Sequence, residues 1–161
     1  MPRSHASPWW LHVFILLIIS VLAAWVVNVN RPNPLPWWGD FATQKSEKTV
    51  QSGIAVLTPA QAISTLKAGT SQFVDARDPD EFSTGHIPGA LNISADSLAL
   101  GQADISGLAK DRPFIIYCGS VSCDKSDELA KALKSLGFTN LSIMPEGFEG
   151  WQAAGGPVEA K

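Results

Sequence analysis

The chain has 161 residues, of which 45% are hydrophobic and 17% are charged, and its formal net charge is −3. This length is enough for one domain of ordinary size with an appendage. From Val50 onward eight lysines and arginines face thirteen aspartates and glutamates, a net charge of −5. Such a balance offers no basic face to a phosphate backbone, so nucleic acid is not an expected partner.

Residues 9–27 read WWLHVFILLIISVLAAWVV, without one aspartate, glutamate, lysine or arginine. As a helix they would span roughly 28 Å, close to the ~30 Å hydrocarbon core of a bilayer. A buried core helix usually shows a polar stripe, and this segment has none. The sequence therefore predicts a tail and transmembrane anchor over residues 1–28, with the lipid bilayer as the partner of residues 9–27.

A cleaved signal peptide is the alternative to an anchor. The apolar run is longer than a usual signal core, and no small-residue cleavage site follows it, because it ends in Trp25-Val26-Val27-Asn28. Basic residues on the two sides are nearly balanced, with Arg3 before the run and Arg31 after it. The short amino-terminal tail favours a single-pass protein whose soluble domain lies on the periplasmic or extracytoplasmic side.

Residues 29–49 carry alternate prolines, Pro32, Pro34 and Pro36, followed by a polar stretch. Alternate prolines favour an extended backbone, so the segment is predicted to be a semi-rigid stalk. The domain is then expected to occupy residues 50–161.

The predicted domain alternates short apolar strands with helices. Strands are expected over 54–57, 73–75, 90–93, 113–117 and 141–144, and helices over 58–69, 126–136 and 147–154. The first helix has Thr58 as its N-cap, Pro59 at its first position and Gly69 at its end. The strand ending in FIIY is apolar throughout, as expected for a strand buried on both faces. This alternation predicts an α/β domain with a mainly parallel sheet, and such sheets bind ligands at the carboxyl ends of their strands.

Cys118 directly follows the FIIY strand, and the loop GSVSCDK then leads into a helix. Amides of the loop and of the first helical turn, together with the helix dipole, would favour a nucleophilic thiolate at this position. Asp124 and Asp127 partly oppose that effect by adding negative charge. A cysteine after a buried strand is otherwise more often a small core residue, so the loop is what favours a nucleophile.

Two groups of motifs resemble the signatures of the rhodanese family. The first group is VDARDPDEF at 74–82, GHIPGA at 85–90 and Asn92-Ile93. The second group is IYC at 116–118, Gly137-Phe138, EGFEGW at 146–151 and GPV at 156–158. Together they cover roughly residues 50–159 in the family's order.

The resemblance implies a three-layer α/β fold with a five-stranded parallel sheet, and no metal or organic cofactor. It also implies that Cys118 takes a sulfane sulfur as a persulfide and passes it to a thiol acceptor. Arg77 would line the pocket, Asp75 would support the loop, and His86 would be structural. The amides that cradle the sulfur would be those of Gly119, Ser120, Val121, Ser122, Cys123, Asp124 and Lys125.

The loop departs from the family pattern in length and charge. It is two residues longer than in family sulfurtransferases and carries Lys125 where they have an arginine. Related dual-specificity phosphatases need an arginine six residues after the cysteine to clamp a phosphoryl group, and Asp124 stands there, which disfavours phosphatase activity. Arg77 and Lys125 are nevertheless expected to supply positive charge to a small anionic sulfur donor such as thiosulfate.

Cys123 is the second departure, five residues after Cys118 in a loop that must curl. It is either a spare thiol or a resolving cysteine that attacks a persulfide on Cys118. Sulfur transfer is thus the predicted function. The alternatives are a Cys118/Cys123 thiol–disulfide relay with a membrane or periplasmic redox partner, and a non-catalytic binding module.

Overall fold

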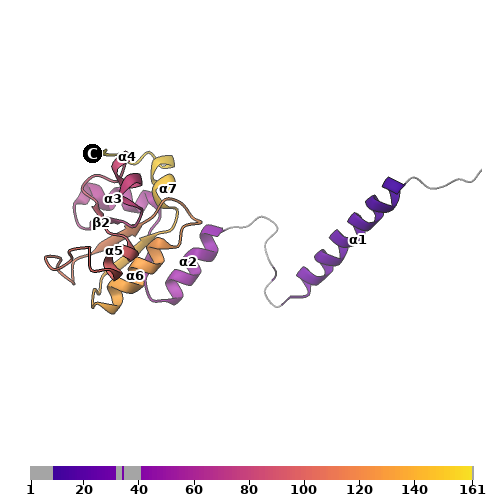
Figure 1. The fold of residues 1–161 in the computed structure, drawn as a ribbon, viewed down its shortest axis with the longest axis horizontal. Helices are drawn as coiled ribbons and strands as arrows, with labels where there is room; N and C mark the ends of the chain where they lie inside the picture. Colours follow the sequence, from indigo (N-terminus) through magenta and orange to yellow (C-terminus); the bar gives the residue numbers. More distant parts are fainter. Residues whose placement is uncertain (1–8, 32–33, 35–40, 161) are drawn as a thin grey trace, which may run out of the picture. The chain divides into compact units, whose positions relative to one another are not determined.

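The computed structural model describes residues 9–31, 34 and 41–160, and the chain divides into two compact units, residues 1–40 and 41–161 (Figure 1). The predicted tail over residues 1–8 and most of the proline-rich segment before residue 41 lie outside the described residues.

The first unit contains helix α1, Trp9–Val29. It ends where the amide of the Asn30 side chain donates to the Val26 carbonyl oxygen at 2.8 Å. By length and composition α1 is able to cross a membrane, a property that it shares with signal sequences.

The second unit is built on a five-stranded sheet, which confirms the predicted α/β class. The strands are all parallel in the order β1-β5-β4-β2-β3. Their bounds are β1 Ala55–Val56, β2 Gln72–Asp75, β3 Leu91–Asn92, β4 Phe114–Tyr117 and β5 Leu141–Met144. All four residues of the central strand β4 are buried, as the FIIY pattern predicts. Asp75, Asn92, Tyr117 and Met144 are in register, so four strands end at one edge.

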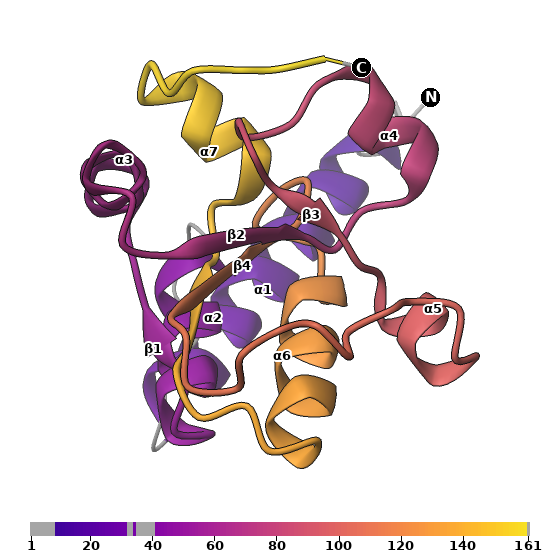
Figure 2. The ribbon, with the colours of Figure 1, turned by 90° about the vertical axis from the view of Figure 1, so that its left-hand side faces the viewer.

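Helices cover both faces of the sheet, which gives the predicted three layers (Figure 2). Helices α3 (Pro59–Ala68) and α7 (Gly147–Ala153) pack on one face, and α5 (Ala95–Ala99) and α6 (Lys125–Ser135) on the other. Trp151 is fully buried in the α3/α7 layer, where its indole N–H donates to the Pro157 carbonyl oxygen at 2.8 Å. A further short helix, α4 (Pro79–Thr84), follows β2.

The ends of α3 are formed by the residues predicted from the sequence. The Thr58 hydroxyl accepts a hydrogen bond from the Gln61 backbone N–H, and the Gln61 side-chain oxygen accepts one from the Thr58 backbone N–H at 2.9 Å. Gly69 ends the helix with a φ of +64°, a conformation that glycine adopts without strain.

The predicted stalk is wrong over residues 41–49, because helix α2, Phe41–Gln51, occupies them. The compact unit accordingly begins at Phe41, not at Val50. Polar contacts dock this helix: the Thr49 hydroxyl lies 2.7 Å from Asp127 Oδ1, and Lys45 Nζ lies 3.4 Å from Asp127 Oδ2. Because Lys45 and Thr49 are polar residues that become buried, no apolar stripe in the sequence indicates the helix.

Loss of α2 is expected to destabilise the domain. A chain lacking residues 1–52 should unfold with a free energy about 2–4 kcal/mol below that of a chain lacking residues 1–40, because Asp127 loses its partners. Urea unfolding of the two truncated chains measures the difference. Equal stabilities would show that α2 contributes no net stability to the domain.

Candidate functional site

Cys118 lies at the carboxyl end of β4 and is only 3% exposed to solvent. Its carbonyl oxygen accepts a hydrogen bond from the Phe148 amide at 2.7 Å, and the next carbonyl, that of Gly119, accepts one from Glu149 at 2.9 Å. The end of the central strand is therefore fastened to the first turn of α7.

Gly147 makes this attachment possible. Its φ is +64°, and a Cβ atom at this position would lie 2.6 Å from the Cys118 carbonyl oxygen. Any larger residue would have to push the cysteine backbone away from α7. The EGFEGW motif thus has a direct structural role beside Cys118.

Cys118 and Cys123 are joined by a disulfide, with their Cα atoms 6.2 Å apart. The intervening loop curls as predicted, and the Cys123 amide donates to the Ser120 carbonyl oxygen at 3.1 Å. The hydroxyls of Ser120 and Ser122 lie 3.0 Å apart across the turn. In this closed loop the Cys123 amide is thus taken up by Ser120, whereas the resemblance places it in the cradle around a transferred sulfur.

Arg77, which is expected to line the pocket and to supply positive charge to an anionic donor, is paired inside the domain. It is 5% exposed, and its guanidinium forms a fork with Asp75, with Nε 3.0 Å from Oδ1 and a terminal nitrogen 2.6 Å from Oδ2. The same nitrogen donates to the Gly85 carbonyl oxygen at 2.7 Å, and the guanidinium carbon lies 4.3 Å from the centre of the Phe148 ring. Its positive charge is therefore balanced within the protein.

The pairing with Asp75 also affects the ionisation of Arg77. Burial lowers the pKa of Arg77, but the hydrogen bonds and charge of Asp75 outweigh burial, so the pKa is raised above its ordinary value. The resemblance implies that Asp75 supports the cysteine loop by hydrogen bonds. Asp75 instead accepts the Arg77 amide at 2.9 Å, and so shapes the turn that follows β2.

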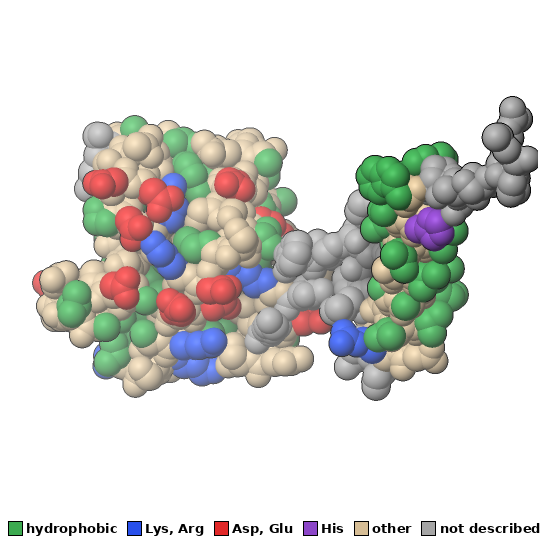
Figure 3. All heavy atoms as spheres, turned by 45° about the vertical axis from the view of Figure 1, so that its right-hand side comes forward, with side chains coloured by type: hydrophobic (Ala, Val, Ile, Leu, Met, Phe, Trp, Pro, Cys, Tyr) green, Lys and Arg blue, Asp and Glu red, His purple; other side chains and the backbone are tan. Residues whose placement is uncertain are grey.

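Lys125 is also paired, although on the surface. Its Nζ lies 2.8 Å from both carboxylate oxygens of Asp78, and this hydrogen bonding raises the pKa of Lys125. Lys125 is the first residue of α6, so it opens the helix after the loop. Figure 3 shows acidic and basic side chains lying next to one another on the visible face of the domain. Neither predicted cation is thus free of a carboxylate partner.

Lys45, which no predicted motif includes, also reaches the loop. From α2 its Nζ donates to the Cys123 carbonyl oxygen. Lys45 lies in the polar stretch taken for a stalk, outside the rhodanese-like motifs, so no sequence signal pointed to it.

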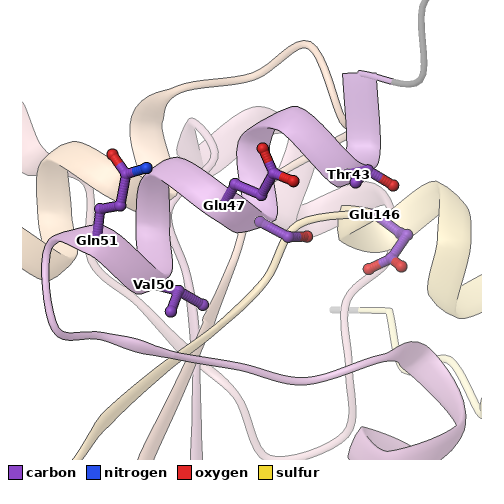
Figure 4. Close-up of a pocket in the computed structure, with 6 residues that line it drawn as sticks. Thr43, Glu47, Val50, Gln51 and Glu146 are labelled. Carbon is purple, nitrogen blue, oxygen red and sulfur yellow. The ribbon is translucent and has the colours of Figure 1, made fainter.

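Helix α2 also shapes the surface next to the turn after β5. A groove of about 480 Å³ lies between the helix and Glu146 (Figure 4). Its lining residues are Thr43, Ser46, Glu47, Val50, Gln51 and Glu146. Because Glu146 immediately precedes Gly147, this groove adjoins the segment that fastens Cys118.

The family model for the rhodanese-like domain matches residues 58–154, more than half of the chain. The chain belongs to the rhodanese-like family. Its match to the thiosulfate sulfurtransferase GlpE of Shewanella oneidensis is 35% identical over 101 residues, covering 61% of this chain and 92% of that protein. An HTH-type transcriptional regulator of Mycobacterium tuberculosis is 31% identical over 103 residues, but the chain spans only 44% of its length.

A solved structure supports the same fold for this rhodanese-like domain. A Rhodopseudomonas palustris protein of unknown function, described as a possible tyrosine phosphatase, is 28% identical with a TM-score of 0.59. The similarity covers 78% of this chain and 98% of that protein. Helix α2 precedes the segment matched by the family model, so Lys45 and Thr49 are contributed from outside it.

Tyr117, the last residue of β4, is fully buried, and its hydroxyl oxygen accepts the Ile87 amide at 3.1 Å. Burial, and then the charge of Asp75, raise its pKa far above the ordinary value of about 10. The native state therefore binds the phenolic proton more tightly than the unfolded state does.

Because Tyr117 is the chain's single tyrosine, tyrosinate absorbance in the ultraviolet reads this group alone. The absorbance should not appear until the domain unfolds, and stability should be full below pH ~10 and fall as the pH rises further. A tyrosinate signal at pH ~10 in the folded protein would contradict this. Tyr117→Phe, the control, should show no signal and lose about 1 kcal/mol with the hydrogen bond to Ile87.

Proposed function

We propose that the chain is a membrane-anchored sulfurtransferase or persulfide carrier in which Cys118 is the nucleophile and Cys123 the resolving cysteine. The observation that carries the proposal is the place of Cys118, at the carboxyl end of β4 with the Cys123 sulfur bonded to its own. Ligands of parallel sheets bind at this edge. The similarity to a thiosulfate sulfurtransferase supports sulfur transfer as the chemistry.

The reaction begins from the reduced loop. The Cys118 thiolate attacks the outer sulfur of the donor, a persulfide forms on Cys118, and the rest of the donor leaves with the bonding electron pair as sulfite or a thiolate. An acceptor thiolate then takes the outer sulfur, and Cys118 leaves as a thiolate. No net oxidation or reduction of the protein accompanies this transfer.

Cys123 provides a second way to release the sulfur. Its thiolate attacks the Cys118 sulfur of the persulfide, the disulfide forms, and the outer sulfur leaves as hydrosulfide. The protein then holds an oxidised pair, and a dithiol partner must supply two electrons to reopen the loop. This partner would be a membrane or periplasmic dithiol.

The charges around the loop favour a persulfide over thiosulfate as the donor. Arg77 is neutralised by Asp75 and Lys125 by Asp78, so neither offers an unpaired charge to a dianion. A persulfide carries less negative charge and needs less compensation. We therefore propose low turnover with thiosulfate.

The disulfide also favours a second candidate, a thiol–disulfide relay with a redox partner. In that case Cys118 and Cys123 exchange electrons with the partner's cysteines and no sulfur atom is carried. The two candidates differ in what adds to Cys118: a sulfur atom for the carrier, and a mixed disulfide with the partner for the relay.

Substitution of each cysteine distinguishes the roles. Cys118→Ser should abolish persulfide formation and sulfur transfer, because no nucleophile remains. Cys123→Ser should retain the persulfide and lengthen its lifetime at least tenfold, since the intramolecular attacker and its high effective concentration are gone. Mass spectrometry of the protein after incubation with a persulfide donor follows the added sulfur atom over time.

Undiminished transfer by Cys118→Ser would remove that residue from the mechanism. Equal persulfide lifetimes in the wild type and Cys123→Ser would leave plain sulfur transfer without a resolving step. The absence of any added sulfur on a reduced wild-type protein, together with disulfide exchange, would favour the relay.

The membrane part of the proposal rests on α1, which is long and apolar enough to cross a bilayer. We propose that residues 9–27 anchor the chain and that the domain faces the periplasmic or extracytoplasmic side, where a disulfide persists.

An anchor and a cleaved signal give different fractionation results. The full chain should stay with membranes after a carbonate wash, and a truncated chain that begins at Phe41 should be soluble. Release of the intact full chain by carbonate would contradict the anchor. A mature amino terminus beyond Val27 would identify the run as a cleaved signal.

A further inference from the structure

Lys45 makes an unusual contact between α2 and the cysteine loop. Its residue is 8% exposed, its Nζ donates to the Cys123 carbonyl oxygen, and it pairs with Asp127 Oδ2 at 3.4 Å. Lysines are seldom this buried unless they have partners. Lys45 has two, one on the loop and one in the first turn of α6.

Thr49, one turn later in α2, fixes the same arrangement. It is 1% exposed, and its hydroxyl lies 2.7 Å from Asp127 Oδ1 and 3.0 Å from the Lys45 carbonyl oxygen. Asp127 Oδ2 is buried without a hydrogen bond in the part of the chain that the structure describes, and Lys45 is the cation facing it. The charge of the Lys45 ammonium is thus balanced by Asp127. Its main effect on the loop is therefore to fix the position of Cys123, and not to add positive charge.

Both polar backbone groups of Cys123 are therefore held. The Cys123 amide donates a hydrogen bond to the Ser120 carbonyl oxygen, and Lys45 Nζ donates one to the Cys123 carbonyl oxygen. Cys118, the other half of the disulfide, is held by α7 through the Phe148 amide. Different helices therefore hold the two ends of the loop: α7 holds Cys118, and α2 holds Cys123.

We propose that Lys45 is a positioning residue that holds Cys123 within bonding reach of Cys118 and thereby sets the redox equilibrium of the pair. The inference rests on the proposed role of Cys123. Without Lys45 the reduced loop would sample more conformations, the effective concentration of one thiol at the other would fall, and the disulfide would become easier to reduce.

The test is the equilibrium of the full chain in detergent with mixtures of reduced and oxidised glutathione. Each disulfide formed in the protein reduces one glutathione disulfide to two thiols. Lys45→Met should lower the equilibrium constant for the Cys118–Cys123 disulfide about tenfold, the effect of one hydrogen bond, which corresponds to a potential ~30 mV less negative. Lys45→Arg, which keeps a charged donor, should recover most of the difference.

Lys134 provides the matched control. Its Nζ donates to the Ser52 carbonyl oxygen at 2.8 Å, so it also ties a backbone carbonyl at the end of α2 to α6, but it does not touch the cysteine loop. Lys134→Met should leave the equilibrium constant unchanged. If circular dichroism shows that Lys45→Met does not fold, Lys45→Gln is measured in its place. Its equilibrium constant should be lower than that of the wild type by about threefold.

An unchanged constant in the folded Lys45 variant would overturn the inference, and so would an equal shift in Lys134→Met, which would indicate general loosening of α2. A wild-type protein that forms no disulfide across the glutathione series would overturn it too. Sulfur loading of Cys123→Ser needs no disulfide, so failure of the proposed sulfur transfer appears in that separate measurement.

Discussion

The site depends on the attachment of the Cys118–Gly119 backbone to the first turn of α7. The carbonyl groups of these two residues, which directly follow the central strand, accept hydrogen bonds from the Phe148 and Glu149 amides, and only a glycine at position 147 lets the two segments come so close. The strand is buried on both faces, and main-chain hydrogen bonds hold the cysteine at the edge of the sheet. The rest of the loop is then free to differ from the family pattern in length and charge without moving Cys118.

Much of the fold was predictable because its signals are local. Three of these signals depend only on adjacent residues, and all three have the predicted structure: the apolar FIIY strand, the Thr58–Pro59 helix start and Gly69 at the helix end. The position of Cys118 at the end of a buried strand could be read in the same way. These local patterns did not indicate the short helices α4 and α5, although Phe82 of α4 is buried and Leu98 of α5 packs against the core.

The missed features depend on partners that are distant in the sequence. The sequence shows that Lys125 is a cation, but not that Asp78, 47 residues earlier, neutralises it. Likewise the sequence does not show that Lys45 contacts the Cys123 carbonyl or that Thr49 contacts Asp127. Each of these partners is 78 residues away in the chain. A helix docked by hydrogen bonds shows no hydrophobic periodicity, so the sequence of α2 predicts a stalk and not a helix.

The burial of Trp151 has a practical spectroscopic consequence. The chain has six tryptophans, and the other five all lie within the first 38 residues. A chain that begins at Phe41 therefore keeps a single indole, enclosed in the core with its N–H bonded to Pro157. Its fluorescence reports on the packing of one layer of the domain, whereas in the full chain the five indoles of the first 38 residues also contribute to the signal.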